Sequence, residues 1–289
     1  MRKLMSKFLC LPAGKMKVFS LGLLIFSVLA VNAHAQTILG TAGSYAVLGA
    51  TGVSNTGATT LGGDLGVSPG PATSLTGTGT ITFSAGSIDI GDAATAQGNA
   101  LTAYNSLSAL SGTNLTGQDL GGLTLGAGVY NFSSSAQLTG TVTLNFAGAS
   151  NEAIVIVIGS TLTTASASKV VIEGGNSTDS VYWVVGSSAT LGTTSAFQGN
   201  IISLTSDSLD TGATDTCGSV IALNGAVTLE GNTIDAGCNG ATTTTGLGPG
   251  PTPTPTPEGG SPLLYLGFFL VPIGAMGAFR FRRRSSCSC

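Results

Sequence analysis

The chain has 289 residues, of which 44 are glycine and only 8% are charged. Between residues 36 and 260 a single lysine stands against all 13 acidic residues, so this segment has a net charge of −12. We therefore expect no nucleic acid partner and no binding to anionic lipid surfaces. The one histidine, His34, lies upstream of that segment, which excludes a Ser-His-Asp triad there.

The first 35 residues are typical of a signal peptide that directs export. A basic start precedes an apolar run from Val18 to Val31, and the tripeptide AHA, which ends at Ala35, matches a cleavage site. Met16 offers an alternative start, because the residues that follow it form a complete signal by themselves. We expect the mature chain to begin at Gln36 and to act outside the cytoplasm.

The C-terminal part of the chain has the composition of a linker followed by an anchor. Residues 248–260 are a Pro/Thr-rich linker, residues 261–279 are almost entirely apolar, and residues 280–289 form a basic tail. The apolar run is long enough for one membrane span, with the arginines as a stop-transfer signal. It also fits a sorting signal that is cleaved near the two glycines at the end of the linker. Both interpretations place the folded domain, residues 36–247, outside the cytoplasm, anchored at the cell surface or released.

Within the mature domain the cysteines form one pair, Cys217 and Cys238. An even number of cysteines in an exported domain predicts a disulfide between them. A metal site is the weaker interpretation, because the domain offers no histidine or other soft ligand. We expect no cofactor.

Short apolar runs broken by Gly, Asn and Asp fill residues 37–247 and predict β-strands joined by turns. A loose repeat recurs along them, in which a strand is followed by a small residue, a spacer and a polar residue. Its spacings of 26, 27, 17 and 19 residues are counted between Ser133, Gly159, Gly186, Ser203 and Ala222. Periods near 20 residues indicate an all-β solenoid, in which each coil buries one face against its neighbours.

One segment, residues 92–110, departs from this pattern. Its apolar residues recur in steps of three and four, as on one face of an α-helix, with Asp92 as a candidate N-cap and Gly112 as a candidate stop. We expect this amphipathic helix to lie along the solenoid and to cover apolar side chains. Its apolar positions are Ala93, Ala96, Ala100, Tyr104, Leu107 and Leu110.

The period of two in the repeated strands predicts which side chains face solvent. In IISLTS we expect Ile202 to face inward and Ser203 outward, in VIALNG Ile221 inward and Ala222 outward, and Trp183 to lie inside. The outward residues would form a rigid grid of small and hydroxyl-bearing side chains, with strands about 4.7–4.9 Å apart. An ordinary exposed sheet would carry Lys, Glu and Arg instead. Their near absence predicts a surface that orders water.

These features are shared with a known family. Residues 37–247 resemble the bacterial and fungal ice-binding proteins of the DUF3494 type, through the motifs LGTAGSYAVLGATGVSNTG, GDLGVSPG, AQGNALTAYNSL, LGAGVYNF and NGAVTLEGNTI. The resemblance implies a right-handed β-solenoid of triangular cross-section with one long α-helix packed alongside. It also implies that the N-terminal strand docks beside the C-terminal coils, which would bring Thr51 next to the corresponding polar residues of those coils. The partner would be ice or ordered water, and we expect a monomer.

The resemblance further implies an ice-binding face with a T-A/G-x-T/N pattern. Its small position corresponds to Gly49, Ser133, Gly159, Gly186, Ser203 and Ala222. Its last position corresponds to Thr51, Ser135, Thr161, Ser188, Thr205 and Asn224. The first position departs from the pattern, because it is apolar in every coil: Leu48, Phe132, Ile158, Val185, Ile202 and Ile221. We expect the residues at the small and last positions to adsorb to ice and so to inhibit its growth and recrystallisation.

Two alternatives compete with ice binding. A β-solenoid polysaccharide lyase needs carboxylate-bound Ca²⁺ and a basic residue, and a glycoside hydrolase needs two carboxylates close in space. Lys169 is the one basic residue available, and Asp207 and Asp210 are typical of a turn, so we expect no enzyme. A cell-surface adhesive or structural solenoid that binds a glycan or a neighbouring cell is the second alternative. It would show a groove with exposed aromatic side chains.

Overall fold

The computed structural model describes residues 38–237, and every structural statement below concerns that part of the chain. Within it, no helix is long and apolar enough to cross a membrane. Four predicted segments lie outside the described residues: the signal peptide (1–35), the linker (248–260), the apolar segment (261–279) and the basic tail (280–289).

The predicted disulfide also reaches beyond the described residues, because Cys238 lies outside them. Its predicted partner Cys217 is 5% exposed and lies on the inner side of the fold. The pairing therefore stays a prediction. Residues 38–237 contain no group of three or more His, Cys, Asp and Glu side chains that could hold a metal ion.

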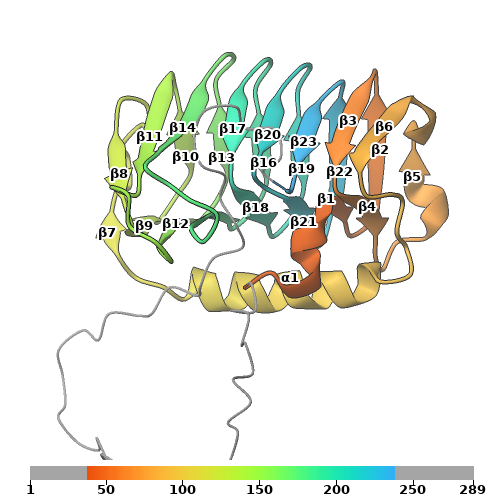
Figure 1. Cartoon of the computed structure of the whole chain (residues 1–289), viewed down its shortest axis with the longest axis horizontal. Coiled ribbons are helices and arrows are strands. Elements are labelled where there is room, and N and C mark those ends of the chain that lie inside the picture. Colours follow the sequence, from red (N-terminus) through yellow and green to blue (C-terminus); the bar gives the residue numbers. More distant parts are fainter. Residues whose placement is uncertain (1–37, 238–289) are drawn as a thin grey trace, which may run out of the picture. The chain divides into compact units, whose positions relative to one another are not determined.

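The strands form three sheets, A, B and C, in which neighbouring strands run parallel, and each coil passes from A to B to C (Figure 1). In spatial order sheet A contains β4 (Asp64–Val67), β1 (Tyr45–Gly49), β21 (Val220–Ala222), β18 (Asn200–Ser203), β15 (Ser180–Val185), β12 (Ala153–Ile158), β9 (Gly128–Phe132) and β7 (Thr113–Asn114). Sheet B contains β5 (Leu75–Thr76), β2 (Gly52–Thr56), β22 (Ala226–Glu230), β19 (Asp207–Leu209), β16 (Ala189–Leu191), β13 (Leu162–Thr164) and β10 (Ala136–Leu138). Sheet C contains β6 (Ile81–Ala85), β3 (Thr59–Gly62), β23 (Thr233–Asp235), β20 (Thr214–Thr216), β17 (Ala196–Gln198), β14 (Lys169–Glu173), β11 (Thr141–Asn145) and β8 (Thr124–Gly126). The expected three-sided all-β solenoid is confirmed.

The coils do not stack in sequence order. Strands β1, β2 and β3 of the N-terminal coil pair with β21, β22 and β23 of the last coil, as the resemblance implies. The second coil, β4 to β6, then pairs on the outer side of the first. The chain therefore builds one end of the stack, crosses to the other end, and returns coil by coil until it meets its own start.

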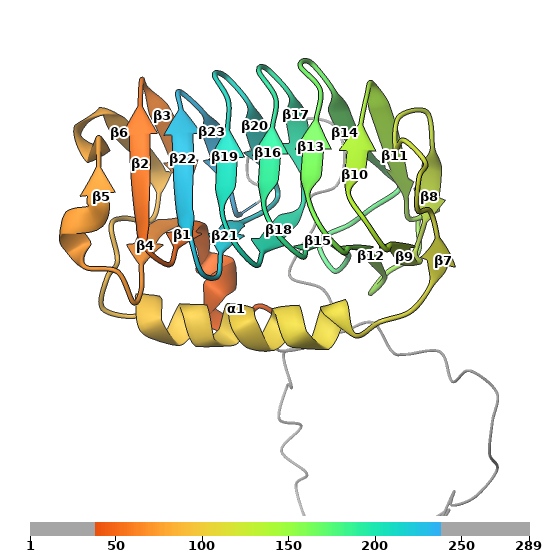
Figure 2. The same cartoon turned by 180° about the vertical axis from the view of Figure 1, so that it is seen from behind.

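The crossing is made by helix α1 (Ala93–Ser108), which runs beside sheet A from the β6 end to the β7 end (Figures 1 and 2). Its 16 residues span about 24 Å, against about 34 Å for a stack of eight strands. Asp92 is the N-cap residue, although its side chain makes no capping hydrogen bond, and the helix ends before Ala109. Three short 3₁₀ helices complete the fold: η1 (Gly40–Ser44), η2 (Ala72–Ser74) and η3 (Thr78–Thr80).

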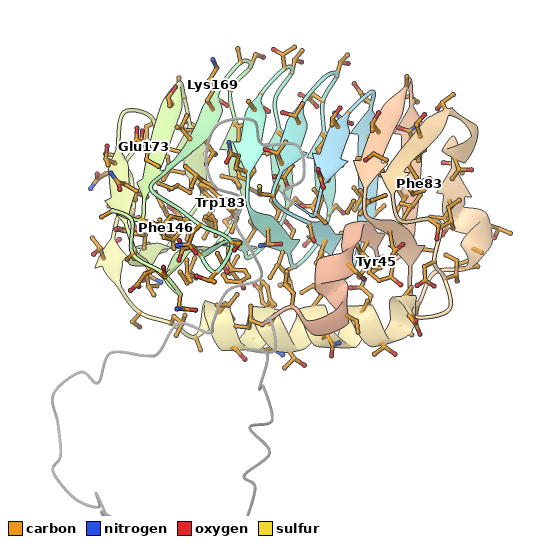
Figure 3. The ribbon with its side chains drawn as sticks, in the orientation of Figure 1. Tyr45, Phe83, Phe146, Lys169, Glu173 and Trp183 are labelled. Carbon is orange, nitrogen blue, oxygen red and sulfur yellow. The ribbon has the colours of Figure 1, made fainter. Side chains whose placement is uncertain are left out.

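Two apolar clusters hold these parts together. The larger one fills the inside of the solenoid, where Trp183 is fully buried (Figure 3). The centroid of its ring lies 4.8 Å from that of Phe197. The smaller one lies between α1 and the outer face of sheet A. The helix contributes Ala93, Ala96, Ala100, Ala103 and Leu107 to it, so the predicted amphipathic face is confirmed. Sheet A is consequently buried on both faces, whereas sheets B and C have uncovered outer faces.

Candidate functional site

The residues predicted at the small position do not form one outward rank. Val185 pairs with Ser203, and Ser203 pairs with Ala222, so these three side chains share one rank of sheet A that points into the solenoid. Ser203 and Ala222 are fully buried, and Gly49 is buried as well. The expectation that Ser203 and Ala222 face solvent is therefore wrong.

The physical reason is that the predicted motif shifts by one residue, relative to the strand pairing, between the early coils (β9 to β17) and the late coils (β18 to β23). Phe132, Ile158 and Val185 lie inside the solenoid, whereas Ile202 and Ile221 lie on the opposite face of sheet A, under α1. Shifting a strand by one residue turns every side chain to the other face. Because both faces of sheet A are apolar, the sequence offers no alternation that would have revealed the shift.

In the early coils the small position is needed for stacking. Ser133, Gly159 and Gly186 follow the sheet A strands at the corner that leads to sheet B, and the Gly186 N–H donates to the carbonyl of Ile158 at 2.7 Å. A Cβ atom on Gly159 would come within 2.8 Å of the Ser133 carbonyl, and one on Gly186 within 2.6 Å of the Gly159 carbonyl. Small residues at this corner thus let adjacent coils approach each other.

The residues predicted at the last position are accessible but lie along that corner. Ser135, Thr161 and Ser188 directly precede β10, β13 and β16, and the Thr161 hydroxyl donates to Ser135 Oγ at 2.8 Å. In the late coils the predicted last position is out of register by one residue. The Thr205 N–H donates to the carbonyl of Ser187, the residue before Ser188. The exposed Asn224 side chain donates to the Leu204 carbonyl at 2.7 Å.

Thr51 lies where the resemblance places it. It is exposed in the N-terminal coil, and its N–H donates to the carbonyl of Gly225 in the last coil at 3.0 Å. The structure therefore brings Ser135, Thr161 and Ser188 into one row, with Thr51, Thr205 and Asn224 farther along the same corner but not in the same register.

The most regular polar row of the described chain lies on the outer face of sheet B, and the sequence analysis missed it. In six of its strands the outward side chain of the row lies between two buried ones, as Thr163 lies between Leu162 and Thr164, whereas Thr76 of β5 follows the half-buried Leu75 at the edge of the sheet. These outward residues pair strand to strand without a register break. Figure 2 shows the strands of sheet B side by side. We call them the sheet B row: Gln137, Thr163, Thr190, Ser208, Thr228, Ser54 and Thr76.

The sheet B row has the dimensions of a regular lattice. Neighbouring strands are about 4.7–4.9 Å apart, so seven strands give a row of about 29 Å. The corner row of Ser135, Thr161 and Ser188 lies two residues earlier on each strand, which is about 6.6–6.8 Å away. Ser54 Oγ donates to Thr228 Oγ1 at 3.5 Å, a contact between strands that are 174 residues apart in sequence. The two rows together form a grid of hydroxyl groups, with the amide of Gln137 at one end, on rigid strands.

Charge distinguishes sheet B from sheet C. The sheet B row contains no ionisable side chain, because Asp207 at the start of β19 points inward and is 2% exposed. Glu230, at the end of β22, accepts a hydrogen bond from Thr211 Oγ1 at 2.9 Å beside the row. Sheet C instead carries the exposed Lys169 and Glu173 on β14 (Figure 3). Among the uncovered faces, sheet B is the one with an unbroken uncharged row.

Comparisons with known proteins identify the family of this chain. A model of the family described as Ice-binding-like matches residues 47–235, which includes nearly all of the solenoid. The chain belongs to this family. An ice-binding protein from Nostoc sp. (strain HG1) is 47% identical over 227 residues, a match that covers 75% of this chain and 81% of that protein. Ice-binding protein K3-B1 from Typhula ishikariensis is 34% identical, with coverage of 58% and 76%.

Solved structures of family members have the same fold. The crystal structure of an ice-binding protein from the Antarctic ascomycete Antarctomyces psychrotrophicus superposes with a TM-score of 0.63 and 35% identity, covering 68% of this chain and 97% of that one. An ice-binding protein from an Antarctic biological consortium gives a TM-score of 0.61 with 41% identity, covering 68% and 89%. These relatives are named as ice-binding proteins, and none of these names describes an adhesin or an enzyme.

Proposed function

We propose that this protein binds ice through the outer face of sheet B. The observation that carries the proposal is the uncharged, in-register sheet B row, which lies on one of the two uncovered faces of the solenoid. The names of the relatives support ice as the ligand. The apolar first position of the predicted motif does not weaken this proposal, because those residues lie in the core or under α1.

Adsorption follows from the chemistry of this face. Threonine and serine hydroxyls donate and accept hydrogen bonds, and the threonine methyl groups between them order the adjacent water. The strands hold these groups at fixed spacings, so little conformational entropy is lost when the ordered water merges with a growing ice plane. Ice then advances only as curved fronts between bound molecules, which lowers the local freezing point and inhibits recrystallisation.

The proposal extends to where the protein acts. Export is supported by the basic start, the apolar run and the AHA site within residues 1–35, and surface attachment by the apolar residues 261–279 with their arginine cluster. A monomer suffices, because one solenoid carries the whole row.

The proposed function is tested by ice recrystallisation in a frozen sucrose solution that contains the purified protein. We expect the ice grains to stay small for hours in its presence, and to coarsen normally with the same amount of heat-unfolded protein. Grains that coarsen equally with folded and unfolded protein would overturn the proposal. Circular dichroism at the assay temperature establishes that the first sample is folded.

A further inference from the structure

The interior of one coil contains acidic side chains. In the coil formed by β18, β19 and β20, Asp207 and Asp215 point into the solenoid and are 2% and 0% exposed. Ser203 and Cys217 of the same coil are buried with them. The adjacent coils present apolar side chains at the paired positions, Ala189 and Val227 beside Asp207 and Phe197 and Ile234 beside Asp215.

No basic side chain of residues 38–237 lies in this interior. Lys169 is the one basic residue of the described chain, and it is exposed on sheet C. Asp215 is the titratable group that interacts with Asp207, and Cys217 in turn lies near Asp215. Strands β16, β18 and β22 present Ala189, Ser203 and Val227, none of which titrates. Within residues 38–237 no protein group makes a well-formed hydrogen bond to either carboxyl group.

Burial without a cation favours the neutral form of both acids. Desolvation raises the pKa of Asp207 to about 7, and the nearby Ser203 hydroxyl and Ala189 N–H only partly oppose this rise. Desolvation also raises the pKa of Asp215 well above its usual value, and the charges of Asp207 and of Cys217 in its reduced form add to that rise, which the nearby Gly199 N–H only partly opposes. Charged carboxylates at this depth would have to draw in water or open the coil.

We propose that Asp207 and Asp215 form a buried pair of protonated acids, and that their ionisation at alkaline pH disables the ice-binding face. The link to that face is covalent, because Asp207 directly precedes Ser208 of the sheet B row on β19. A coil that opens to hydrate Asp207 displaces Ser208 from the plane of its neighbours. The second half of this inference rests on the proposed function, whereas the first half concerns the fold alone.

The sign of the pH dependence follows from the raised pKa values. An unfolded chain ionises its aspartates near pH 3.9, whereas the folded chain keeps Asp207 protonated up to about pH 7 and raises the pKa of Asp215 well above its usual value. The stability contributed by the neutral pair is therefore complete below pH 3.9 and is lost as the pH rises through the folded pKa values. Each carboxyl group increases the unfolding equilibrium constant by up to about tenfold per pH unit in that window.

The fold arm of the test is denaturant unfolding of the full protein between pH 4 and pH 9. We expect the unfolding equilibrium constant to rise with pH. Between pH 4 and pH 7, Asp207→Asn should reduce this rise by the contribution of one carboxyl group, which is up to about tenfold per pH unit. Asp210→Asn is the matched control, because Asp210 belongs to the same coil but is partly exposed. A parent protein with no slope over this range, or equal slopes in the parent and Asp207→Asn, would overturn the acid pair. If Asp207→Asn does not fold, the slope of the parent still decides.

The function arm is thermal hysteresis at pH 6 and pH 9. We expect the parent to lose most of its activity at pH 9, and Asp207→Asn to retain more of it. Equal activity of the parent at both values would overturn the link between the pair and the ice-binding face. Absence of activity at both values would overturn the proposed function instead, and the unfolding slope, which needs no ice, would still report on the pair.

Discussion

Thr190→Tyr should weaken ice binding by interrupting the sheet B row. Thr190 lies on β16 between Thr163 and Ser208, and its side chain is partly exposed on the outer face. A tyrosine ring at this position stands above the plane of the neighbouring hydroxyl groups and holds the flat face away from a flat ice surface. The substitution changes no buried group.

The size of the effect follows from the length of the row. The row has seven positions over about 29 Å, and Thr190 is the third from the β10 end. Blocking it leaves an uninterrupted run of four residues, from Ser208 to Thr76, which spans about 14 Å. The contact that remains is about half of the original length. We expect thermal hysteresis at equal concentration to fall several-fold, while the free energy of unfolding changes by less than about 0.5 kcal/mol.

The assay compares thermal hysteresis of the parent, Thr190→Tyr and Thr143→Tyr over the same concentration series. Thr143 is the matched control, because it is a partly exposed threonine in the middle of β11 on sheet C. We expect Thr143→Tyr to match the parent. If Thr190→Tyr were as active as the parent and Thr143→Tyr were impaired, the face would be sheet C and the argument from the uncharged row would be refuted.

Two further predictions concern the packing that keeps the face rigid. Leu107→Ala should lower the free energy of unfolding by about 2–5 kcal/mol, because Leu107 is fully buried between α1 and sheet A. Leu101→Ala, at a position that is 46% exposed, should change it by less than about 0.5 kcal/mol, and similar losses in both would refute the packing of the helix. Asn232→Ala should cost at least about 2 kcal/mol, because the buried Asn232 amide donates to two carbonyl oxygens of the preceding coil at 2.9 and 3.0 Å. Asn224→Ala, at an exposed asparagine, should cost less than about 1 kcal/mol in the same denaturant titration, and an equal loss would contradict the role of Asn232.

The fold was largely predictable because its signals are long or repeated. The steps of three and four in residues 92–110 predicted a helix, and the structure has one at Ala93–Ser108. The recurrence of short strands at about 20 residues predicted the solenoid. The docking of the N-terminal strand came from the family resemblance, since nothing local in β1 indicates that it pairs with β21.

The candidate site was less predictable because its strands are short. LTT at β13 and ATL at β16 are three residues long, and a single polar residue between two buried ones is too brief to reveal a period. The sheet A strands gave the stronger pattern, but α1 buries their outer face, so apolar residues there did not distinguish inside from outside. The helix and the strands had to be seen together before Ile202 and Ser203 could be assigned to opposite faces.

The central claim, that the sheet B face adsorbs to ice, is tested most directly on a single ice crystal. Fluorescently labelled protein is first bound to the crystal at its melting point, and the solution is then exchanged for protein-free buffer while the crystal is held supercooled. The account predicts that the parent stays on the ice surface and keeps it from growing, whereas several-fold less Thr190→Tyr remains on the ice after the exchange. Loss of the parent from the ice on exchange, followed by immediate growth, would contradict it.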